Sequence, residues 1–128
     1  MIQAMHTLIY SDDAAATRAF FKDVLQWKFT QDDESGEDWP IFRTGPGELG
    51  VHPTRGEWEG EDYSSPRHHS VSLMCDDLEE TVEELRSRGA EFNGDPQDMG
   101  FGTGIMLRVP GADDMLLYQP KHPTAYDL

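Results

Sequence analysis

The chain has 128 residues, of which 37% are hydrophobic and 10% aromatic, and this is enough for one folded domain with its own core. Twenty-five acidic residues against ten basic ones give a formal net charge of −15, which disfavours nucleic acids and anionic membranes as partners. A single cysteine excludes a disulfide framework, and the lack of a long apolar run or a signal-like start predicts a soluble cytoplasmic protein.

The first half of the chain predicts one helix among short strands. Residues 3–10 are rich in Thr, Leu, Ile and Tyr, which is typical of a strand, and Asp12 or Asp13 is placed to cap a helix over residues 14–25. The expected buried stripe of this helix comprises Ala16, Ala19, Phe20 and Val24. Further strands are expected at residues 27–31, 39–44 and 48–52, with a polar loop at 32–38 and the turn Gly45-Pro46-Gly47 between them.

A linker is predicted at about residues 54–67, because glycine, serine and proline recur along this segment. It is long for a connection, and long connections often serve as lids or binding loops. Its aromatic residues Trp58 and Tyr63 either cover a pocket or anchor the loop onto the body of the protein. The sequence leaves both interpretations open.

The second half predicts the same order of elements. An apolar strand at residues 70–75 precedes a helix over residues 78–88, which Gly89 would end in the left-handed conformation. Cys75 lies in that apolar strand and is expected to be a small core residue rather than a nucleophile. Strands are then expected at residues 91–93 or a little beyond, 104–109 and 114–119, followed by a C-terminal tail at 121–128.

The likeness of the two halves extends to their residues. Asp12 before the first helix corresponds to Asp76 before the second, and Pro46 in the first half corresponds to Pro110 in the second. Both pairs have the same separation, 76 − 12 = 110 − 46 = 64, which is half of the chain length. The sequence therefore predicts one α+β domain made of two βαβββ modules, at about residues 1–53 and 68–120.

This duplicated unit resembles the vicinal oxygen chelate superfamily, which includes glyoxalase I, extradiol dioxygenases and the fosfomycin and bleomycin resistance proteins. The likeness rests on the stretch from His6 to Asp13 with the helix that follows it, and on the closing turn and strand from Val109 to Pro120. It implies that the two modules curl into a glyoxalase-like half-barrel cup. It also implies a homodimer, since members commonly pair and some exchange modules between chains.

The resemblance further implies four metal-ligand positions on the first and last strands of the two modules. They correspond to His6 and His52 in the first module and to Ser70 and Leu116 in the second. Leucine has no lone pair and a serine hydroxyl is a poor ligand, so the full metal site of the family is expected to be absent. An alternative set of His6, His52 and His68 would suit a divalent Zn, Ni, Fe or Mn ion if the chain bends His68 inward.

Acid–base chemistry and ligand contacts are expected from side chains that face the cup. His6 and His52 are the candidate catalytic residues if no metal is bound, because imidazole titrates near neutral pH. Strand alternation selects the residues expected to bind the substrate, which are Tyr10, Ser70, Ser72, Met74, Leu116 and Tyr118.

Three functions are compatible with these residues. The leading interpretation is a glyoxalase-like protein that binds a small organic molecule in the cup, and whether it also catalyses a reaction stays open. The second is a metal-dependent lyase, isomerase or dioxygenase that uses His6 and His52. The third is a resistance protein that holds a drug between aromatic walls, with the acidic surface attracting a cation.

Overall fold

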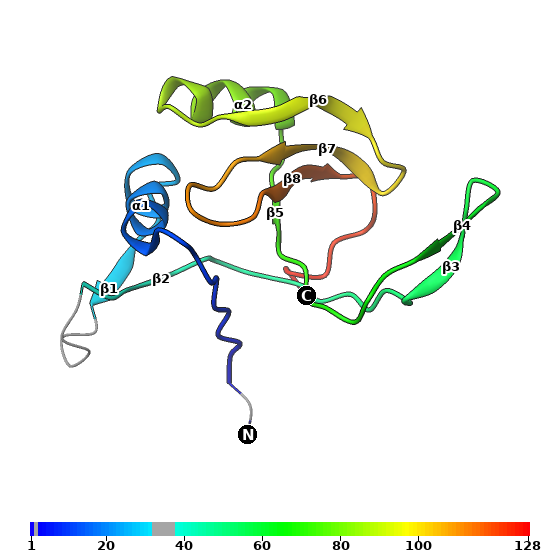
Figure 1. Ribbon diagram of the computed structural model, residues 1–128, viewed down its shortest axis with the longest axis horizontal. Coiled ribbons are helices and arrows are strands. Elements are labelled where there is room, and N and C mark those ends of the chain that lie inside the picture. Colours follow the sequence, from blue (N-terminus) through cyan, green and yellow to red (C-terminus); the bar gives the residue numbers. More distant parts are fainter. Residues whose placement is uncertain (2, 32–37) are drawn as a thin grey trace.

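The computed structural model of the chain describes residues 1, 3–31 and 38–128, so the predicted polar loop at 32–38 lies outside it except for Asp38. The fold is α+β, with two helical segments among short strands (Figure 1). Within these ranges, the helices are too short and polar to cross a membrane. In chain order the elements are α1 (Ala14–Ala19), the π-helical η1 (Phe20–Val24), β1 (Phe29–Gln31), β2 (Pro40–Phe42), β3 (Arg55–Trp58), β4 (Glu61–Ser64), β5 (Ser72–Met74), α2 (Leu78–Ser87), β6 (Phe92–Asp98), β7 (Gly102–Leu107) and β8 (Met115–Pro120).

The second half of the chain forms a four-stranded sheet in the order β5-β8-β7-β6. β5 runs parallel to β8, and the other neighbouring strands are antiparallel. The helix α2 connects β5 to β6 and lies along one side of the sheet (Figure 1). Asp77 starts this helix by accepting a hydrogen bond from the Glu80 N–H at 3.0 Å, and Gly89 follows its end with a φ of +93°. The order of elements predicted for this half is confirmed.

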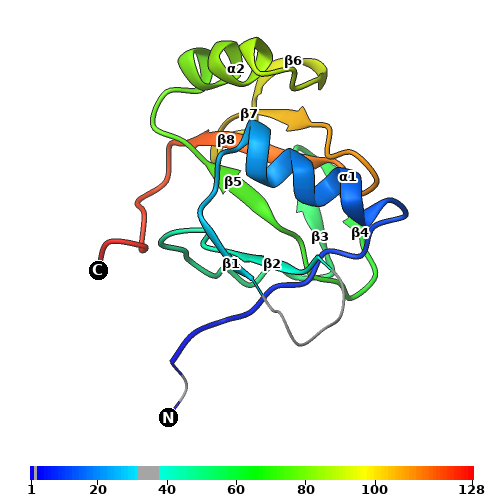
Figure 2. The same ribbon diagram turned by 90° about the vertical axis from the view of Figure 1, so that its left-hand side faces the viewer.

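One hydrophobic core joins the two halves of the chain. Phe20 and Phe21 of η1 are buried in the same cluster as the apolar face of α2 and the helix side of the sheet. The members of this cluster from the second half are Leu78, Val82, Leu85, Ala90, Ile105, Leu107, Val109, Met115 and Leu117. The helical segment of the first half therefore packs on the sheet of the second half (Figure 2).

The start of α1 is hydrogen-bonded to the turn between β7 and β8. The Gly111 carbonyl accepts hydrogen bonds from the Asp12 N–H at 2.8 Å and from the Ser11 hydroxyl at 2.9 Å. The Thr17 hydroxyl donates to the Pro110 carbonyl, which lies in the same turn. These bonds fix the direction in which α1 crosses the sheet.

The buried side of the first helix differs from the expected stripe. Ala19 is exposed, whereas Thr17 and Phe21 are buried. The chain changes from α-helical to π-helical bonding at Phe20, and the wider π turn rotates the side chains that follow. Two adjacent phenylalanines thereby reach the core together.

The first half of the chain departs from the predicted strands. Residues 3–10 are extended and exposed, and within the described part of the chain no strand pairs with them (Figure 1). Residues 48–52 are not in a strand either, and β1 pairs with β2 alone, with Phe29 opposite Phe42. The glycines and prolines of residues 45–53 disfavour a strand between β2 and the N-terminal segment. Without that strand, residues 3–10 have no neighbour among the described residues for their backbone hydrogen bonds.

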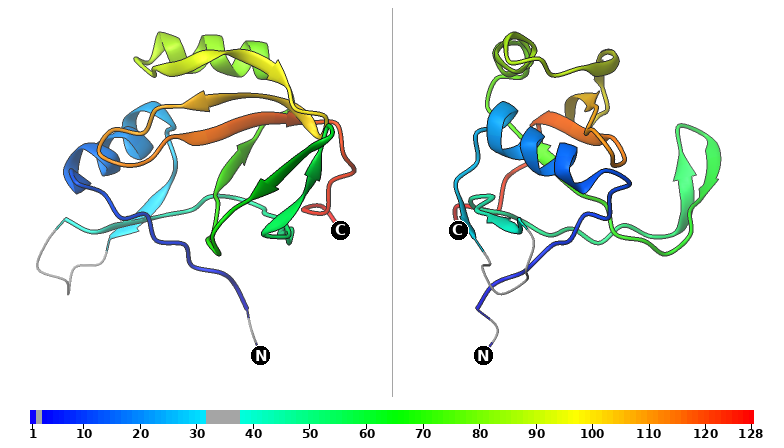
Figure 3. Two further views of the ribbon diagram at one scale, coloured as in Figure 1. Left: turned by 45° about the vertical axis from the view of Figure 1, so that its right-hand side comes forward. Right: turned by 60° about the vertical axis from the view of Figure 1, so that its left-hand side comes forward.

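The segment expected to be a structureless linker contains a β-hairpin. β3 and β4 pair through a two-residue turn in which Glu59 and Gly60 have φ values of +50° and +80°. Two successive left-handed residues match the right-handed twist of the strands they join. The hairpin projects from the body of the molecule (Figure 3). Glutamate rarely adopts this conformation, which is why the turn was not predicted from the sequence.

Candidate functional site

The four-stranded sheet has one covered side and one open side. Residues such as Ile105, Leu107 and Leu117 point to the covered side and are buried in the core. Side chains alternate along a strand, so their neighbours point the opposite way. The strand register sets these neighbours in two rows, which we call the open face: Ser72, Leu116 and Met106 form one row, and Met74, Tyr118 and Gly104 form the next.

The open face is mainly apolar with a few polar groups. Met74, Met106 and Leu116 are half-buried and Ser72 is exposed, although all four lie in a regular sheet. This mixture of apolar surface and isolated hydrogen-bonding groups is typical of small-molecule sites. Four of the residues predicted to bind the substrate, Ser72, Met74, Leu116 and Tyr118, lie side by side here.

Two glycines of β7 let large side chains lie across the sheet. A Cβ atom at Gly104 would come within 2.9 Å of the Leu116 side chain and 3.2 Å of the Met99 sulfur. At Gly102, a Cβ atom would approach the Gln119 carbonyl oxygen to 2.6 Å and the Tyr118 ring to 2.8 Å. The lack of a side chain at Gly102 and Gly104 thus makes room for Leu116 and Tyr118 on the open face.

Tyr118 is at the centre of a polar cluster at one end of the open face. Its side chain is only 8% exposed, and its ring meets Phe101 edge to face at 5.3 Å. Its hydroxyl lies 3.0 Å from Nε2 of His122, and the same nitrogen lies 3.7 Å from a carboxylate oxygen of Glu48. Burial raises the pKa of Tyr118, and the negative charge of Glu48 adds to this. Tyr118 therefore stays a neutral hydrogen-bond donor.

The hydrogen-bond partner of Nδ1 indicates which ring nitrogen of His122 carries the hydrogen. Nδ1 lies 2.8 Å from the Pro123 carbonyl oxygen, which can only accept, so Nδ1 carries the hydrogen. In the neutral ring Nε2 then accepts the hydrogen bond that the Tyr118 hydroxyl donates. With a neutral His122 ring, the Tyr118 phenol is the donor and the imidazole is the acceptor, and the Glu48 carboxylate lies beside them.

The C-terminal residues Lys121–Ala125, which we call the strap, hold His122 in this place. The backbone N–H groups of Lys121 and His122 both donate to the Phe101 carbonyl, at 2.8 and 3.3 Å. The Lys121 ammonium pairs with Asp98 at 2.8 Å, and the Ala125 N–H donates to Glu48 at 2.7 Å. Hydrogen bonding by Lys121 lowers the pKa of Asp98.

Sequence reasoning did not assign His122 or Glu48 to the site. His122 lies beyond the last strand, and Glu48 lies in a loop, so no periodic pattern places either side chain on a face. The only signal was the position of Glu48 four residues before His52. The fold-back of the tail brings the two groups together.

The predicted histidines lie outside the strands that form the open face. His6 is exposed on the unpaired N-terminal segment, where Tyr10 is also 89% exposed. Nδ1 of His52 lies 2.8 Å from the Pro53 carbonyl, and Nδ1 of His68 lies 2.8 Å from the Pro66 carbonyl. Ser70 precedes β5 by two residues and is exposed.

A metal ion of the family type does not fit these residues within one chain. Across residues 1, 3–31 and 38–128, no three His, Cys, Asp or Glu side chains gather closely enough to hold a metal. Leu116, which the family resemblance sets at a ligand position, has no lone pair to offer. No chemical step is therefore assigned to a metal.

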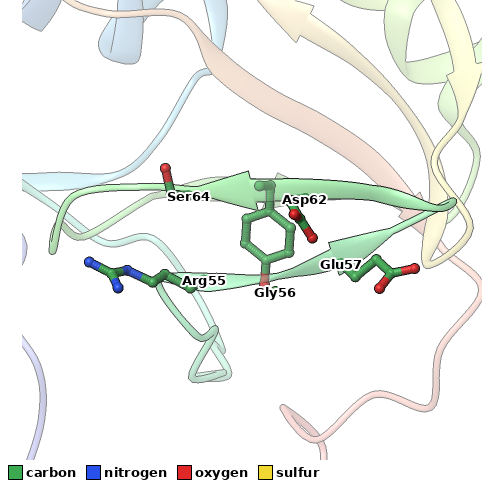
Figure 4. Close-up of a pocket in the computed structure, with 6 residues that line it drawn as sticks. Arg55, Gly56, Glu57, Asp62 and Ser64 are labelled. Carbon is green, nitrogen blue, oxygen red and sulfur yellow. The ribbon is translucent and has the colours of Figure 1, made fainter.

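A shallow pocket also lies on the hairpin (Figure 4). Its residues are Arg55, Gly56, Glu57, Asp62, Tyr63 and Ser64. The Arg55 and Glu57 side chains extend toward opposite ends of the hairpin, so the charged groups do not converge on one point (Figure 4). The Tyr63 ring lies over Gly56, where a Cβ atom would meet it at 2.8 Å. Here the ring completes the packing of the hairpin itself, whereas the anchoring expected from the sequence was onto the body of the protein.

Cys75 is half-buried at the end of β5 and packs against the core. Burial raises the pKa of its thiol, and the nearby Asp76 and Asp77 act in the same direction. A thiol with a raised pKa is a weak nucleophile at neutral pH. Cys75 is thus a packing residue, as its sequence context indicates.

Comparison with known proteins relates most of the chain to one protein superfamily. A sequence model described as Glyoxalase/Bleomycin resistance protein/Dioxygenase superfamily matches residues 3–115. No curated protein sequence matches the chain. Among solved structures, a glyoxalase/bleomycin resistance protein/dioxygenase from Nocardioides aligns with a TM-score of 0.60 and 16% identity, over 98% of this chain and 91% of that one.

Two further structures share the fold. Lactoylglutathione lyase from Agrobacterium tumefaciens aligns with a TM-score of 0.57 and 14% identity, over 91% of this chain and 92% of that one. TnmS3, an antibiotic binding protein from Streptomyces sp. CB03234, aligns with a TM-score of 0.55 and 17% identity, over 94% of this chain and 99% of that one. At these identities the likeness concerns the fold alone.

Proposed function

The chain belongs to the Glyoxalase/Bleomycin resistance protein/Dioxygenase superfamily, and from this premise we propose that it binds a small organic molecule against the open face. The observation that carries the proposal is the pair of side-chain rows on β5, β8 and β7. They combine half-buried apolar groups with the hydroxyls of Ser72 and Tyr118. Ser70, two residues before β5, would extend the polar edge of the face.

Ligand screening with a charge substitution on the face tests this proposal. Catechol, an aldehyde–thiol adduct and a phosphonate antibiotic serve as probes in a thermal-shift screen. A probe that raises the melting temperature of the wild type should lose this effect in Met106→Arg, because a buried charge on the face excludes an apolar ligand. Val51→Arg is the control, since Val51 is apolar, exposed and outside the open face. Equal binding by Met106→Arg and the wild type would refute the open face as the site.

We propose that recognition relies on apolar contacts and hydrogen bonds rather than on the metal site of the family. Ser70 and Leu116 stand at two of the four ligand positions and support this. If the bound molecule is also transformed, His6 and His52 are the residues that we expect to move protons. Elemental analysis of the purified protein tests whether recognition is independent of a metal. Stoichiometric Zn, Ni, Fe or Mn that is lost in His6→Ala/His52→Ala would contradict this proposal.

A second copy of the chain is proposed to complete the site. Residues 3–10 carry no acidic or basic side chain apart from His6, in a chain with a formal net charge of −15. β5 is an outer strand of its sheet, and residues 63–75, which include it, contain no Asp or Glu. An unpaired segment and an unpaired strand edge of low charge favour strand addition between two copies. Such pairing would bring His6 of one copy beside the open face of the other.

Mass measurement in solution tests the dimer. Light scattering during gel filtration should give twice the mass of one chain for the wild type and a single-chain mass for Leu8→Lys. A lysine in the added strand interrupts apolar contact along the edge. Val51→Lys, another exposed apolar position outside residues 3–10, should stay dimeric. A monomeric wild type would exclude this arrangement.

A drug-binding role is the second candidate function. It is favoured by the shared fold with TnmS3, which is described as an antibiotic binding protein. The aromatic pair Phe101 and Tyr118 and the acidic surface would suit a planar or cationic drug. Expression of the gene in a susceptible strain should then raise the inhibitory concentration of the drug, and Met106→Arg should abolish the increase.

A further inference from the structure

The strap forms hydrogen bonds with two polar groups at one end of the open face, the Tyr118 hydroxyl and the Glu48 carboxylate. Its imidazole accepts from the Tyr118 hydroxyl, and its Ala125 N–H donates to the Glu48 carboxylate. The side chains of His122 and Glu48 are 30% and 18% exposed, so both groups lie partly out of water. The ring nitrogen of His122 is thus the partner of the Tyr118 hydroxyl, and the Ala125 N–H is the partner of the Glu48 carboxylate.

The attachment of the strap is of a kind that opens readily. It consists of hydrogen bonds, one exposed ion pair between Lys121 and Asp98, and the contact of the His122 ring with Tyr118 and Glu48. Exposed ion pairs contribute little in water, and chain termini open at low free-energy cost. Departure of the strap would remove the acceptor of the Tyr118 hydroxyl and open this group to water. A ligand that covers the hydroxyl again must supply an acceptor in place of His122, because a buried donor without a partner is unfavourable.

We infer that the strap occupies the place of the ligand, and that the ligand is a nitrogen heteroaromatic compound that displaces it. The compound would present a ring nitrogen to the Tyr118 hydroxyl and an N–H group to Glu48, with its ring against Phe101. This inference rests on the proposed function, because it names the ligand class and the regulation of the same face. A purely apolar ligand is disfavoured, since it would leave the phenol unpaired.

Competition between the strap and a small heteroaromatic probe tests the inference. Benzimidazole carries one ring nitrogen acceptor and one N–H donor, and indene is its hydrocarbon counterpart. Calorimetry should show that full-length His122→Ala binds benzimidazole at least tenfold more tightly than the wild type does. His69→Ala removes an exposed histidine outside the cluster and should bind as the wild type does. Indene should gain less from His122→Ala than benzimidazole does.

The polar contacts are tested in the same background. Tyr118→Phe keeps the ring and removes the hydroxyl, so His122→Ala/Tyr118→Phe should lose the gain in benzimidazole affinity. Ala125→Pro removes the N–H that donates to Glu48 and leaves His122 in place, and it should give an intermediate gain. In the wild type, hydrogen exchange of residues 121–125 should become faster when benzimidazole is bound.

Two results would overturn the inference. One is equal benzimidazole affinity in the wild type, His122→Ala and Ala125→Pro, and the other is a gain that survives Tyr118→Phe. The proposed function fails by a different result, which is screened-probe binding that Met106→Arg leaves intact.

Discussion

At the scale of single residues, the ionisation of Tyr118 makes the free energy of unfolding depend on pH. Its raised pKa means that the unfolded chain, in which tyrosine ionises near pH 10, loses this proton first as pH rises. The stabilising effect of the neutral hydroxyl is complete below about pH 10 and is lost above it. We expect the free energy of unfolding to fall more steeply above this pH in the wild type than in Tyr118→Phe.

A second substitution separates the two causes of the raised Tyr118 pKa, which are burial and the charge of Glu48. Glu48→Gln removes the nearby negative charge but not the burial, so the pKa of Tyr118 should move only part of the way back to its usual value. Absorbance of tyrosinate during a pH titration measures this. Glu57→Gln, on the exposed hairpin, is the matched control and should leave the titration unchanged. A larger effect of Glu57→Gln than of Glu48→Gln would contradict the assigned cause.

Gly111 is the residue on which the attachment of α1 depends. Its φ is +80°, and a Cβ atom would lie 2.5 Å from the Ser11 hydroxyl and 2.8 Å from the Asp13 carbonyl. Gly111→Ala should therefore lower the free energy of unfolding by about 1–3 kcal/mol, measured by urea denaturation. Gly47→Ala is the control, because nothing lies within 4 Å of its Cβ position and its φ is ordinary. Equal stability of the two variants would argue against the steric cause.

At the scale of elements, α2 depends on a local signal that can be removed. The Asp77 side chain accepts a hydrogen bond from the Glu80 N–H at the start of the helix. Asp77→Ala should lower the free energy of unfolding by about 1 kcal/mol, the usual effect of losing such a cap. The neighbouring exposed Asp76 makes no cap, so Asp76→Ala should have a much smaller effect in the same denaturant titration.

The elements that were predicted correctly are those with complete local signals. The helix at Leu78–Ser87 has an aspartate at its start, an apolar stripe and a glycine after its end, and all three are readable in the sequence. Residues 3–10 have the composition of a strand, but a strand also needs a partner, and composition carries no information about partners. The hairpin at residues 55–64 depends on a turn that begins with a left-handed glutamate, which no turn rule favours.

The same distinction explains how much of the candidate site was foreseen. Ser72, Met74, Leu116 and Tyr118 were predicted to share a face because strands alternate with a period of two, and the structure sets them side by side. His122 reaches Tyr118 through an irregular tail, where no period exists. Residues on regular elements were therefore predictable, and residues on loops and tails were not.

At the scale of the whole molecule, the net charge of −15 sets a dependence on salt. Like charges on a compact chain repel one another, and dissolved salt screens this repulsion over about 10 Å at 0.1 M. The melting temperature should rise as sodium chloride is increased from low concentration to about 0.1 M. An uncharged solute at the same osmolarity is the control. A melting temperature that falls with salt would show that ion pairs such as that between Lys121 and Asp98 outweigh the repulsion.

The packing of the first helix on the second sheet also governs how the protein matures on the ribosome. Ser11 and Asp12 are bonded to Gly111, a hundred positions further along the chain. During synthesis, Phe20 and Phe21 emerge long before the strands that will cover them, and they remain exposed until translation is nearly finished. The final structure therefore forms late, and a nascent chain that is released early carries an uncovered aromatic surface.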